Sequence, residues 1–273
     1  MKPRPSRILR KLRAGEVPMV LKINLSDPRV IELAGLAQPD AVWLCTEHVA
    51  NDWIGIEQQI RAARVHDIDS LVRVARGSYS DYIRPLEADA TGIIVPHVET
   101  VEQARQIVEW TRFHPLGKRA LDGGNIDGQF CQLPMDEYLR HANSERIVMI
   151  QIESPEGLEN VEAIAAVPGF DLLMFGAGDF SHRIGKPGDV GAPEVVAARR
   201  RIGAAARKHG KFAMSPGPMA PLPELVAEGY SMIGSGSDVW GLGEYFRQRI
   251  EHMRGQIGAL PPASRAPAKS TYA

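Results

Sequence analysis

Three neighbouring segments of the chain indicate its fold most directly: IVMIQIE (147–153), SPEGLENVEAIAA (154–166) and DLLMFG (171–176). The first and third segments are short and predominantly apolar, as buried parallel strands are. The middle segment has apolar residues at three- and four-residue spacing, which is typical of an amphipathic helix. Ser154, Pro155 and Glu156 form a helix start signal before it. Strand, helix and strand in this order predict a parallel βαβ unit.

The same alternation runs along most of the chain. Eight strands are predicted, at Val17–Asn24, Ala41–Glu47, Leu71–Arg76, Gly92–His97, Ile147–Glu153, Asp171–Gly176, Lys211–Pro216 and Tyr230–Gly234. Outer helices are predicted between them, among them Thr100–Phe113, Pro155–Ala166 and Pro193–His209. Eight βα units in 273 residues match the roughly 250 residues of one barrel.

We therefore predict the α/β class and a single-domain (β/α)8 TIM barrel over residues 1–257. The basic segment from Met1 to Gly15 is expected to form an amphipathic helix on the surface or at an oligomer contact. Residues 258–273 are rich in Pro, Ala and Ser and are expected to form a flexible tail. Residues 115–134 contain four glycines and are expected to form a long active-site loop.

The charge balance argues against a polyanionic partner. Lys and Arg number 32, Asp and Glu number 33, and the formal net charge is -1, so no global field attracts nucleic acid or an anionic membrane. No apolar stretch reaches the length of about 20 residues that crosses a bilayer. The charge balance therefore favours a small-molecule substrate. Two cysteines, Cys45 and Cys131, are expected to be reduced thiols, which favours a cytoplasmic location.

Polar residues at the C-terminal ends of barrel strands are the first candidates for chemistry. Here they are Glu47 and His48 after the second strand, Arg73 on the third, Glu153 on the fifth and Asp179 after the sixth. Glu153 and Asp179 lie one βα unit apart, so adjacent strands can bring both carboxylates to one Mg²⁺, Mn²⁺ or Co²⁺ ion. The alternative is that each carboxylate caps the helix that follows it.

Three further side chains have two interpretations each. His48, the only histidine that both follows a strand end and lies in the Glu47-His48 segment, is either a proton relay or a structural histidine. Arg73 lies in an apolar run and needs an anion, which is either a substrate oxygen or Glu47. Lys22 on the first strand is expected to contact the distal part of a substrate or a neighbouring acid such as Glu47, and the alternative is that it forms a Schiff base.

The order and spacing of several motifs resemble those of the HpcH/HpaI aldolase family, from about Pro18 to Gly236. The motifs are EHVAND (47–52), Arg73, VPHVET (95–100), GKR (117–119), QIE (151–153) and GAGDFS (176–181). The resemblance implies a class II pyruvate aldolase that needs a divalent cation. It implies that Glu153 and Asp179 are metal ligands, His48 the acid/base and Arg73 the group that stabilises the enolate, in a homohexamer built from trimers.

The expected substrate is a 4-hydroxy-2-oxo acid, cleaved to an aldehyde and pyruvate or a related 2-oxo acid. The carboxylate of the 2-oxo acid is expected on the backbone of Gly176, Ala177 and Gly178, where glycines permit close approach. Glu47 and Lys22 complete the predicted substrate contacts, and Glu87 and Arg119 are predicted accessory residues.

Departures from the commoner family pattern concern substrate choice. Cys45 and Glu87 stand where relatives often have aspartate, and Lys22 stands where they often have tryptophan. Beside the aldolase, two alternative functions are considered. One is a CoA-ester lyase of the citrate-lyase-like branch, and the other is a catalytically altered barrel that binds a small acid.

Overall fold

The computed structural model describes residues 3–260. Eight parallel strands close into one barrel, and β1 pairs with both β2 and β8. The strands are β1 (Met19–Lys22), β2 (Ala41–Cys45), β3 (Asp69–Arg73), β4 (Gly92–Val95), β5 (Ile147–Ile152), β6 (Leu172–Phe175), β7 (Phe212–Ser215) and β8 (Met232–Ser237). The predicted barrel is confirmed, with strand ends that differ by a few residues from the predicted bounds.

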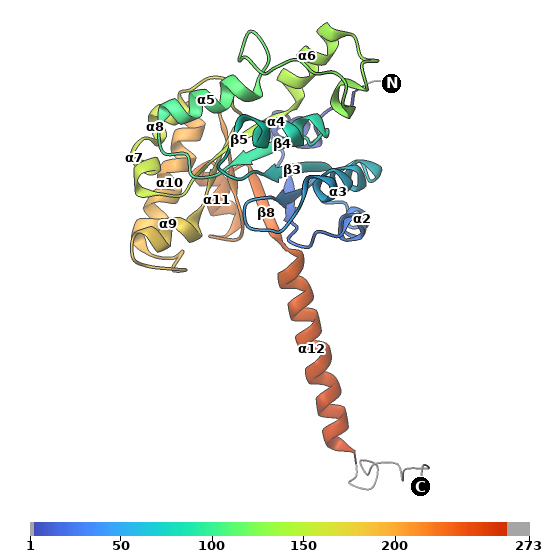
Figure 1. Cartoon of the computed structure of the whole chain (residues 1–273). Helices are drawn as coiled ribbons and strands as arrows, with labels where there is room; N and C mark the ends of the chain where they lie inside the picture. The colour runs from blue at the N-terminus through green and yellow to red at the C-terminus, as the bar shows by residue number, and fades with distance from the viewer. Residues whose placement is uncertain (1–2, 261–273) are drawn as a thin grey trace.

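Within residues 3–260 most of the α-helices surround the barrel, whereas the first closes its base and the last projects away from it (Figure 1). They are α1 (Arg7–Arg13), α2 (Pro28–Leu36), α3 (Trp53–Val65), α4 (Tyr79–Glu87), α5 (Val101–Thr111), α6 (Met135–Glu145), α7 (Pro155–Glu159), α8 (Val161–Ala165), α9 (Ala177–Arg183), α10 (Pro193–Lys208), α11 (Leu222–Glu228) and α12 (Asp238–Ala259). The single helix predicted over 155–166 is wrong in one respect, because Asn160 separates α7 from α8. The predicted loop over 115–134 contains one short 3-10 helix, Ile126–Gly128.

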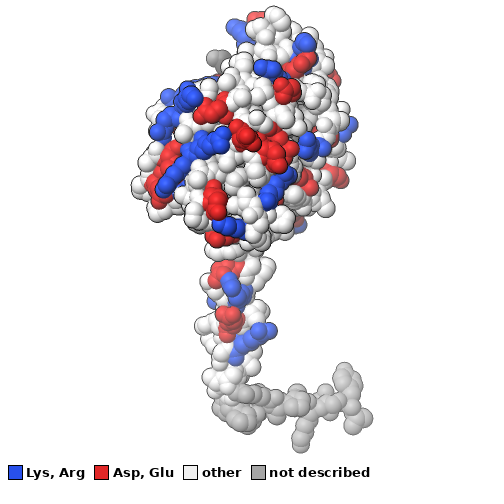
Figure 2. All heavy atoms as spheres, turned by 90° about the vertical axis from the view of Figure 1, so that its left-hand side faces the viewer, with Lys and Arg blue, Asp and Glu red and all other residues white. Residues whose placement is uncertain are grey.

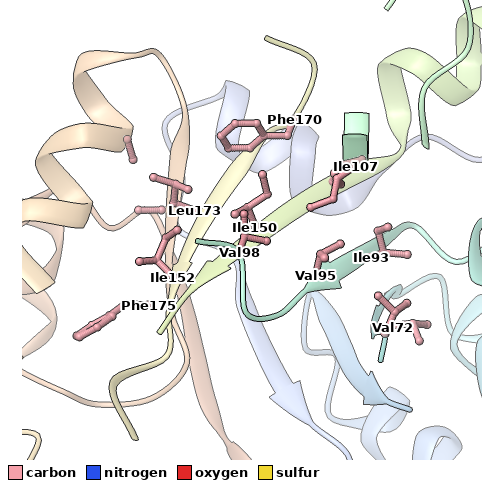
Figure 3. Close-up of a cluster of buried hydrophobic side chains, with 14 of the residues drawn as sticks. Val72, Ile93, Val95, Val98, Ile107, Ile150, Ile152, Phe170, Leu173 and Phe175 are labelled. Carbon is pink, nitrogen blue, oxygen red and sulfur yellow. The ribbon is translucent and has the colours of Figure 1, made fainter. Parts of the chain in front are cut away.

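Alternate residues of each strand face two different apolar layers. One layer lies between the strands and the helices, and Figure 3 shows part of it, with Ile93 and Val95 of β4, Ile150 and Ile152 of β5, and Leu173 and Phe175 of β6. The other layer fills the barrel interior and includes Val20, Trp43, Leu71, Met149 and Met174. The barrel is therefore a packed core, as barrels of this size are.

The N-terminal helix closes the base of the barrel, at the N-terminal ends of the strands. Ile8, Leu9 and Leu12 of α1 are buried and belong to the interior layer. Ser6 caps this helix by accepting a hydrogen bond from the Leu9 N–H. The predicted amphipathic helix is confirmed, but its predicted place on the surface or at an oligomer contact is wrong, because its apolar face packs against the barrel core.

The last helix leaves the barrel. α12 projects from the end of β8, away from the other helices (Figure 1), and none of its residues is buried. Gly258 and Ala259, the start of the predicted flexible tail, belong to this helix, and residues 261–273 lie outside the described part. No helix within residues 3–260 is long and apolar enough to cross a membrane. On the face drawn in Figure 2, positive and negative side chains are interspersed.

Candidate active site

The two-residue period of the strands places the candidate side chains. Val20, Trp43, Leu71 and Met149 face the barrel interior. The next interior positions toward the C-terminal ends are therefore Lys22 on β1, Cys45 on β2, Arg73 on β3 and Gln151 on β5. Glu153 lies one further period beyond Gln151. These polar side chains together form the upper end of the interior, which we call the mouth.

A chain of charged groups crosses the mouth from β3 to β5. Glu47, in the loop after β2, lies with Oε2 3.0 Å from Nε of Arg73 and with Oε1 3.0 Å from Nε2 of His97. Nδ1 of His97 lies 3.0 Å from Oε1 of Glu153, which also accepts a 2.7 Å hydrogen bond from the His97 backbone N–H. The Arg73–Glu47 contact is close, but its N–H is not aligned for a hydrogen bond.

Glu153 is the most constrained carboxylate of the mouth. Burial raises the pKa of Glu153 to about 7, and the charges of Asp179 and Glu47 add to this rise while His97 opposes it. The side-chain amide of Gln151 donates to Oε2 of Glu153, yet its own oxygen, Oε1, is buried without a hydrogen-bond partner. A Cβ at Gly176 would lie 2.7 Å from Oε2 of Glu153, so only glycine allows this approach.

The donor set fits a hard divalent cation. Glu153 is a buried carboxylate that lacks a full counter-charge, and Asp179, in the first turn of α9, is near enough to raise its pKa. Within residues 3–260, no three His, Cys, Asp or Glu side chains are arranged as a metal site. Two carboxylates would leave the remaining positions to water and substrate oxygens, which suits Mg²⁺ or Mn²⁺ better than a closed zinc site.

His48 lies at the solvent side of the mouth. Its side chain is 58% exposed, and its Nε2 lies 3.6 Å from Oε2 of Glu47. Its backbone N–H points to the Cys45 sulfur at 3.4 Å, and Asn51 donates to the Cys45 carbonyl, which holds this loop on β2. His48 is thus partly exposed, as the sequence predicts, and is free to contact a substrate.

Lys22 and Arg73 share one aromatic neighbour. The Lys22 Nζ lies 4.9 Å from the centre of the Trp43 ring, and the Arg73 guanidinium carbon lies 5.1 Å from it. Trp43 is buried in the barrel interior. Burial and the neighbouring Arg73 lower the pKa of Lys22, while Cys45, Asp238 and Glu47 oppose this shift.

The two predicted accessory residues lie together but outside this chain of contacts. Arg119 is buried, donates to Asp127 at 2.9 Å and lies 3.9 Å from Glu87. Tyr138 donates to the same Asp127 carboxylate at 2.7 Å. These contacts hold the 115–134 loop against α6. Burial raises the pKa of Glu87, and Arg119 opposes the rise.

His97 and Gln151 both contact Glu153, although no role was predicted for them from the sequence. His97 also follows a strand end, because β4 ends at Val95 and His97 comes two residues later in a left-handed conformation, with φ at 56°. Gln151 could have been found from strand periodicity, because it lies one period below Glu153. Arg73, for which two partners were open, contacts Glu47.

Comparison with known proteins gives consistent relatives. The model of the HpcH/HpaI aldolase/citrate lyase family matches residues 19–242. A 5-keto-4-deoxy-D-glucarate aldolase of Klebsiella pneumoniae is 33% identical over 86% of this chain and 91% of its own length. A hydroxypyruvate/pyruvate aldolase of Pseudomonas aeruginosa is 34% identical over 71% of this chain and 72% of its own length. The solved structure of an HpcH/HpaI aldolase from Desulfitobacterium hafniense is 26% identical in sequence. It superimposes with a TM-score of 0.84 and covers 93% of this chain and 98% of its own.

Proposed function

Since the chain belongs to the HpcH/HpaI aldolase/citrate lyase family and is a class II aldolase, a carbon–carbon lyase, we propose that it cleaves and forms 4-hydroxy-2-oxo acids. The three-carbon product is pyruvate or a related 2-oxo acid, and the other product is an aldehyde. The observation that carries this proposal is the contact chain from Arg73 through Glu47 and His97 to the buried Glu153.

Cleavage leaves an electron pair on the three-carbon fragment as an enolate, so the site must stabilise negative charge there. A divalent cation held by Glu153 and Asp179 would supply Lewis-acid stabilisation of this charge. Arg73 lies in a buried position and donates to the enolate oxygen, and Glu47 holds its guanidinium in place. The carboxylate of the 2-oxo acid lies against the backbone of residues 176–178, where a Cβ at Gly178 would meet no atom within 4 Å.

Proton transfer at the 4-hydroxyl is assigned to His48. In cleavage its imidazole accepts the hydroxyl proton while the carbon–carbon bond breaks, and in condensation it returns that proton. The half-exposed ring beside Glu47 can reach a substrate that enters from solvent. His97 lies between Glu47 and Glu153 and positions both carboxylates, so it is a positioning residue.

A homo-oligomer, hexameric or built from trimers, accounts for the detached helix. α12 exposes apolar side chains at heptad spacing, namely Val239, Phe246, Ile250, Met253, Ile257 and Leu260. The outward residues Met19, Leu21 and Ile233 of β1 and β8 are exposed or only partly buried, whereas those of β2 to β6 are buried. We propose that α12 of a second copy covers this pair of strands. Light scattering should show an oligomer, and Ile250→Asp with Met253→Asp should shift it toward monomer.

Cys45 and Cys131 are free thiols, which supports a cytoplasmic location. Of the two alternative functions, the CoA-ester lyase has weaker support, because the solved citrate lyase β subunit is 22% identical and shows the fold alone. The catalytically altered acid-binding barrel has no specific observation in its favour, since the mouth keeps the predicted arginine, histidine and carboxylates.

Exchange of the methyl protons of pyruvate in deuterated water tests the enolate directly. We expect NMR to show exchange that EDTA abolishes and that Mg²⁺, Mn²⁺ or Co²⁺ restores. Retro-aldol assays over 4-hydroxy-2-oxo acids then identify the aldehyde, with malyl-CoA as the substrate of the alternative lyase. Full exchange in thoroughly chelated protein would contradict the metal assignment, and no exchange with any of the three metals would contradict the aldolase mechanism.

A further inference from the structure

The first residue of α12 reaches back to the mouth of the barrel. One carboxylate oxygen of Asp238 accepts a hydrogen bond from the Asn24 N–H and the other accepts one from the Leu25 N–H, each at 2.9 Å. Among the side chains of α12 within residues 3–260, Asp238 alone forms a hydrogen bond or an ion pair with a residue outside the helix. This carboxylate therefore bonds the projecting helix to the barrel (Figure 1).

An extra residue in β8 places this carboxylate over the end of β1. Val20 of β1 pairs with Gly234 of β8. The next pair, Lys22 with Ser237, is two residues further along β1 but three further along β8. Gly236 lies within this bulge with φ at 119°, in the left-handed region that favours glycine. Bulges bend a strand and re-aim the side chains beside them, and here they turn the start of α12 toward the segment after β1.

Two side chains from different helices fix the segment after β1. Asp238 accepts its N–H groups, and Gln59, buried on α3, donates to the Leu25 carbonyl at 2.9 Å. Without the Asp238 carboxylate, the N–H groups of residues 24 and 25 have no other hydrogen-bond acceptor within residues 3–260. α3 belongs to the shell of the barrel, whereas α12 projects from it (Figure 1). The position of this segment therefore depends in part on the direction of α12.

The segment after β1 lies on one particular side of the mouth. β1 and β5 are four strands apart in the closed order of eight, so residues 23–27 lie on the wall opposite Glu153. A substrate with its 2-oxo acid end at Glu153 turns its aldehyde-derived end toward this wall. Small displacements of groups that position a substrate are costly, so a shift of this segment should weaken the binding of the aldehyde first.

We propose that Asp238 is a positioning residue that couples the docking of α12 to the aldehyde side of the mouth. This inference rests on the proposed aldolase function and on the proposed docking of α12 against a second copy. When α12 is docked, its first turn is held and its carboxylate fixes residues 24 and 25. When α12 is free, only the bulge and these two hydrogen bonds set its direction, so the bonds open more often and the wall moves.

Amide hydrogen exchange measures this clamp directly. We expect slow exchange in a peptide that contains residues 24 and 25 of the unaltered oligomer. Asp238→Ala should speed this exchange about tenfold, because the hydrogen bonds to a charged group are lost. Asp238→Asn should have a smaller effect, since one amide oxygen still accepts. Ile250→Asp with Met253→Asp, which undocks α12, should also speed the exchange, and adding Asp238→Ala to this variant should change little further.

The same variants test the effect on the substrate. In condensation with pyruvate, Asp238→Ala should raise KM for acetaldehyde and for glyoxylate by about five- to tenfold, with a smaller change in kcat. A residue that served stability alone would not separate KM from kcat in this way. Undocking α12 should raise KM by a similar factor, and the combined variant should not exceed the larger of the two effects.

Glu244 offers a matched control. It is a second carboxylate of α12, but its bonds to Arg247 and Gln248 stay within the helix. Glu244→Gln should therefore leave both amide exchange and KM unchanged. Unchanged exchange at residues 24 and 25 in Asp238→Ala, additive effects in the combined variant, or a monomer by light scattering would contradict the coupling. Exchange of the methyl protons of pyruvate by the unaltered protein tests the aldolase function separately, so either idea can fail alone.

Discussion

The mouth and the base of this barrel both contain buried carboxylates, but the carboxylates differ in how many donors within the chain they receive. At the base, Asp69 is fully buried and accepts hydrogen bonds from Arg4, from the Ser6 hydroxyl and from the Ile8 N–H, each at 2.8 Å. At the mouth, Glu153 is as deeply buried but has no arginine or lysine beside it, and its pKa is raised to about 7.

This difference distinguishes carboxylates that stabilise the folded protein from carboxylates that are available to bind a ligand. A buried anion that receives several donors within the chain contributes to stability, because its desolvation is offset by those bonds. A buried anion without enough donors costs free energy until a cation binds. In barrels generally the base serves stability and the mouth serves chemistry, and here the hydrogen-bond partners of each carboxylate make the same distinction.

The largest expected effect comes from Glu153→Gln at the mouth. The change keeps side-chain size but removes one ligand charge, so kcat for retro-aldol cleavage should fall about a thousandfold, or about 4 kcal/mol. The free energy of unfolding of the metal-free protein should not fall, because a neutral amide avoids the desolvation that raises the pKa of Glu153. Steady-state kinetics and urea unfolding measure the two quantities. If the Glu153→Gln variant unfolded more easily and kept its kcat, Glu153 would be a stabilising carboxylate like Asp69, and the comparison between mouth and base would be wrong.

At the base, Asp69→Asn should show the opposite pattern. It leaves Arg4 and two further donors around a neutral amide, and breaking a buried charged network costs about 3 kcal/mol. The midpoint of urea unfolding should therefore fall, while kcat of the folded protein stays within about twofold of the parent value. Loss of kcat at unchanged stability would show that the base takes part in chemistry.

The free energy of unfolding should depend on pH with opposite signs for a carboxylate at the mouth, Glu153, and a carboxylate at the base, Asp40. Between its ordinary value of 4.5 and about 7, Glu153 holds a proton in the folded protein that the unfolded chain has released. The free energy of unfolding therefore falls as pH rises through this range. We expect the stability of Glu153→Gln relative to the parent to grow by about 2 kcal/mol from pH 5 to pH 8, in EDTA.

Asp40 at the base supplies the contrast. Burial alone would raise the pKa of Asp40, but hydrogen bonds from Lys11 and from the Met19 N–H outweigh it, and the pKa is lowered. Its contribution is present above the ordinary value of 3.8 and is lost as pH falls below it. Urea unfolding of the parent, Glu153→Gln and Asp40→Asn over a pH series checks both signs. A parallel pH profile for all three proteins would contradict the assignments.

The sequence predicts the barrel well, because eight apolar strands at regular intervals leave few other packings. It also places Arg73 and Glu153 at the mouth, since both occupy strand ends. It could not predict the role of His97, which depends on a left-handed turn two residues after β4. The detachment of α12 was also missed, because an apolar stripe indicates that a helix is buried but not against which surface.

The smallest expected effects come from removing one lysine at each end. At the base, Lys11 is one of three donors to Asp40, which keeps Arg7 at 3.0 Å and the Met19 N–H at 2.9 Å when Lys11 is replaced. Lys11→Met should therefore lower the free energy of unfolding by less than about 1 kcal/mol, with kcat/KM unchanged for acid and neutral aldehydes alike.

At the mouth, Lys22→Met removes an ammonium that has no bonded partner among residues 3–260, so unfolding should be no easier and can be harder. Urea unfolding of both variants separates the two ends even at this scale. If Lys22→Met destabilised the protein more than Lys11→Met did, Lys22 would be a structural cation like those at the base. The mouth would then contain a charged group that stabilises the fold, and the two ends would no longer differ in this respect.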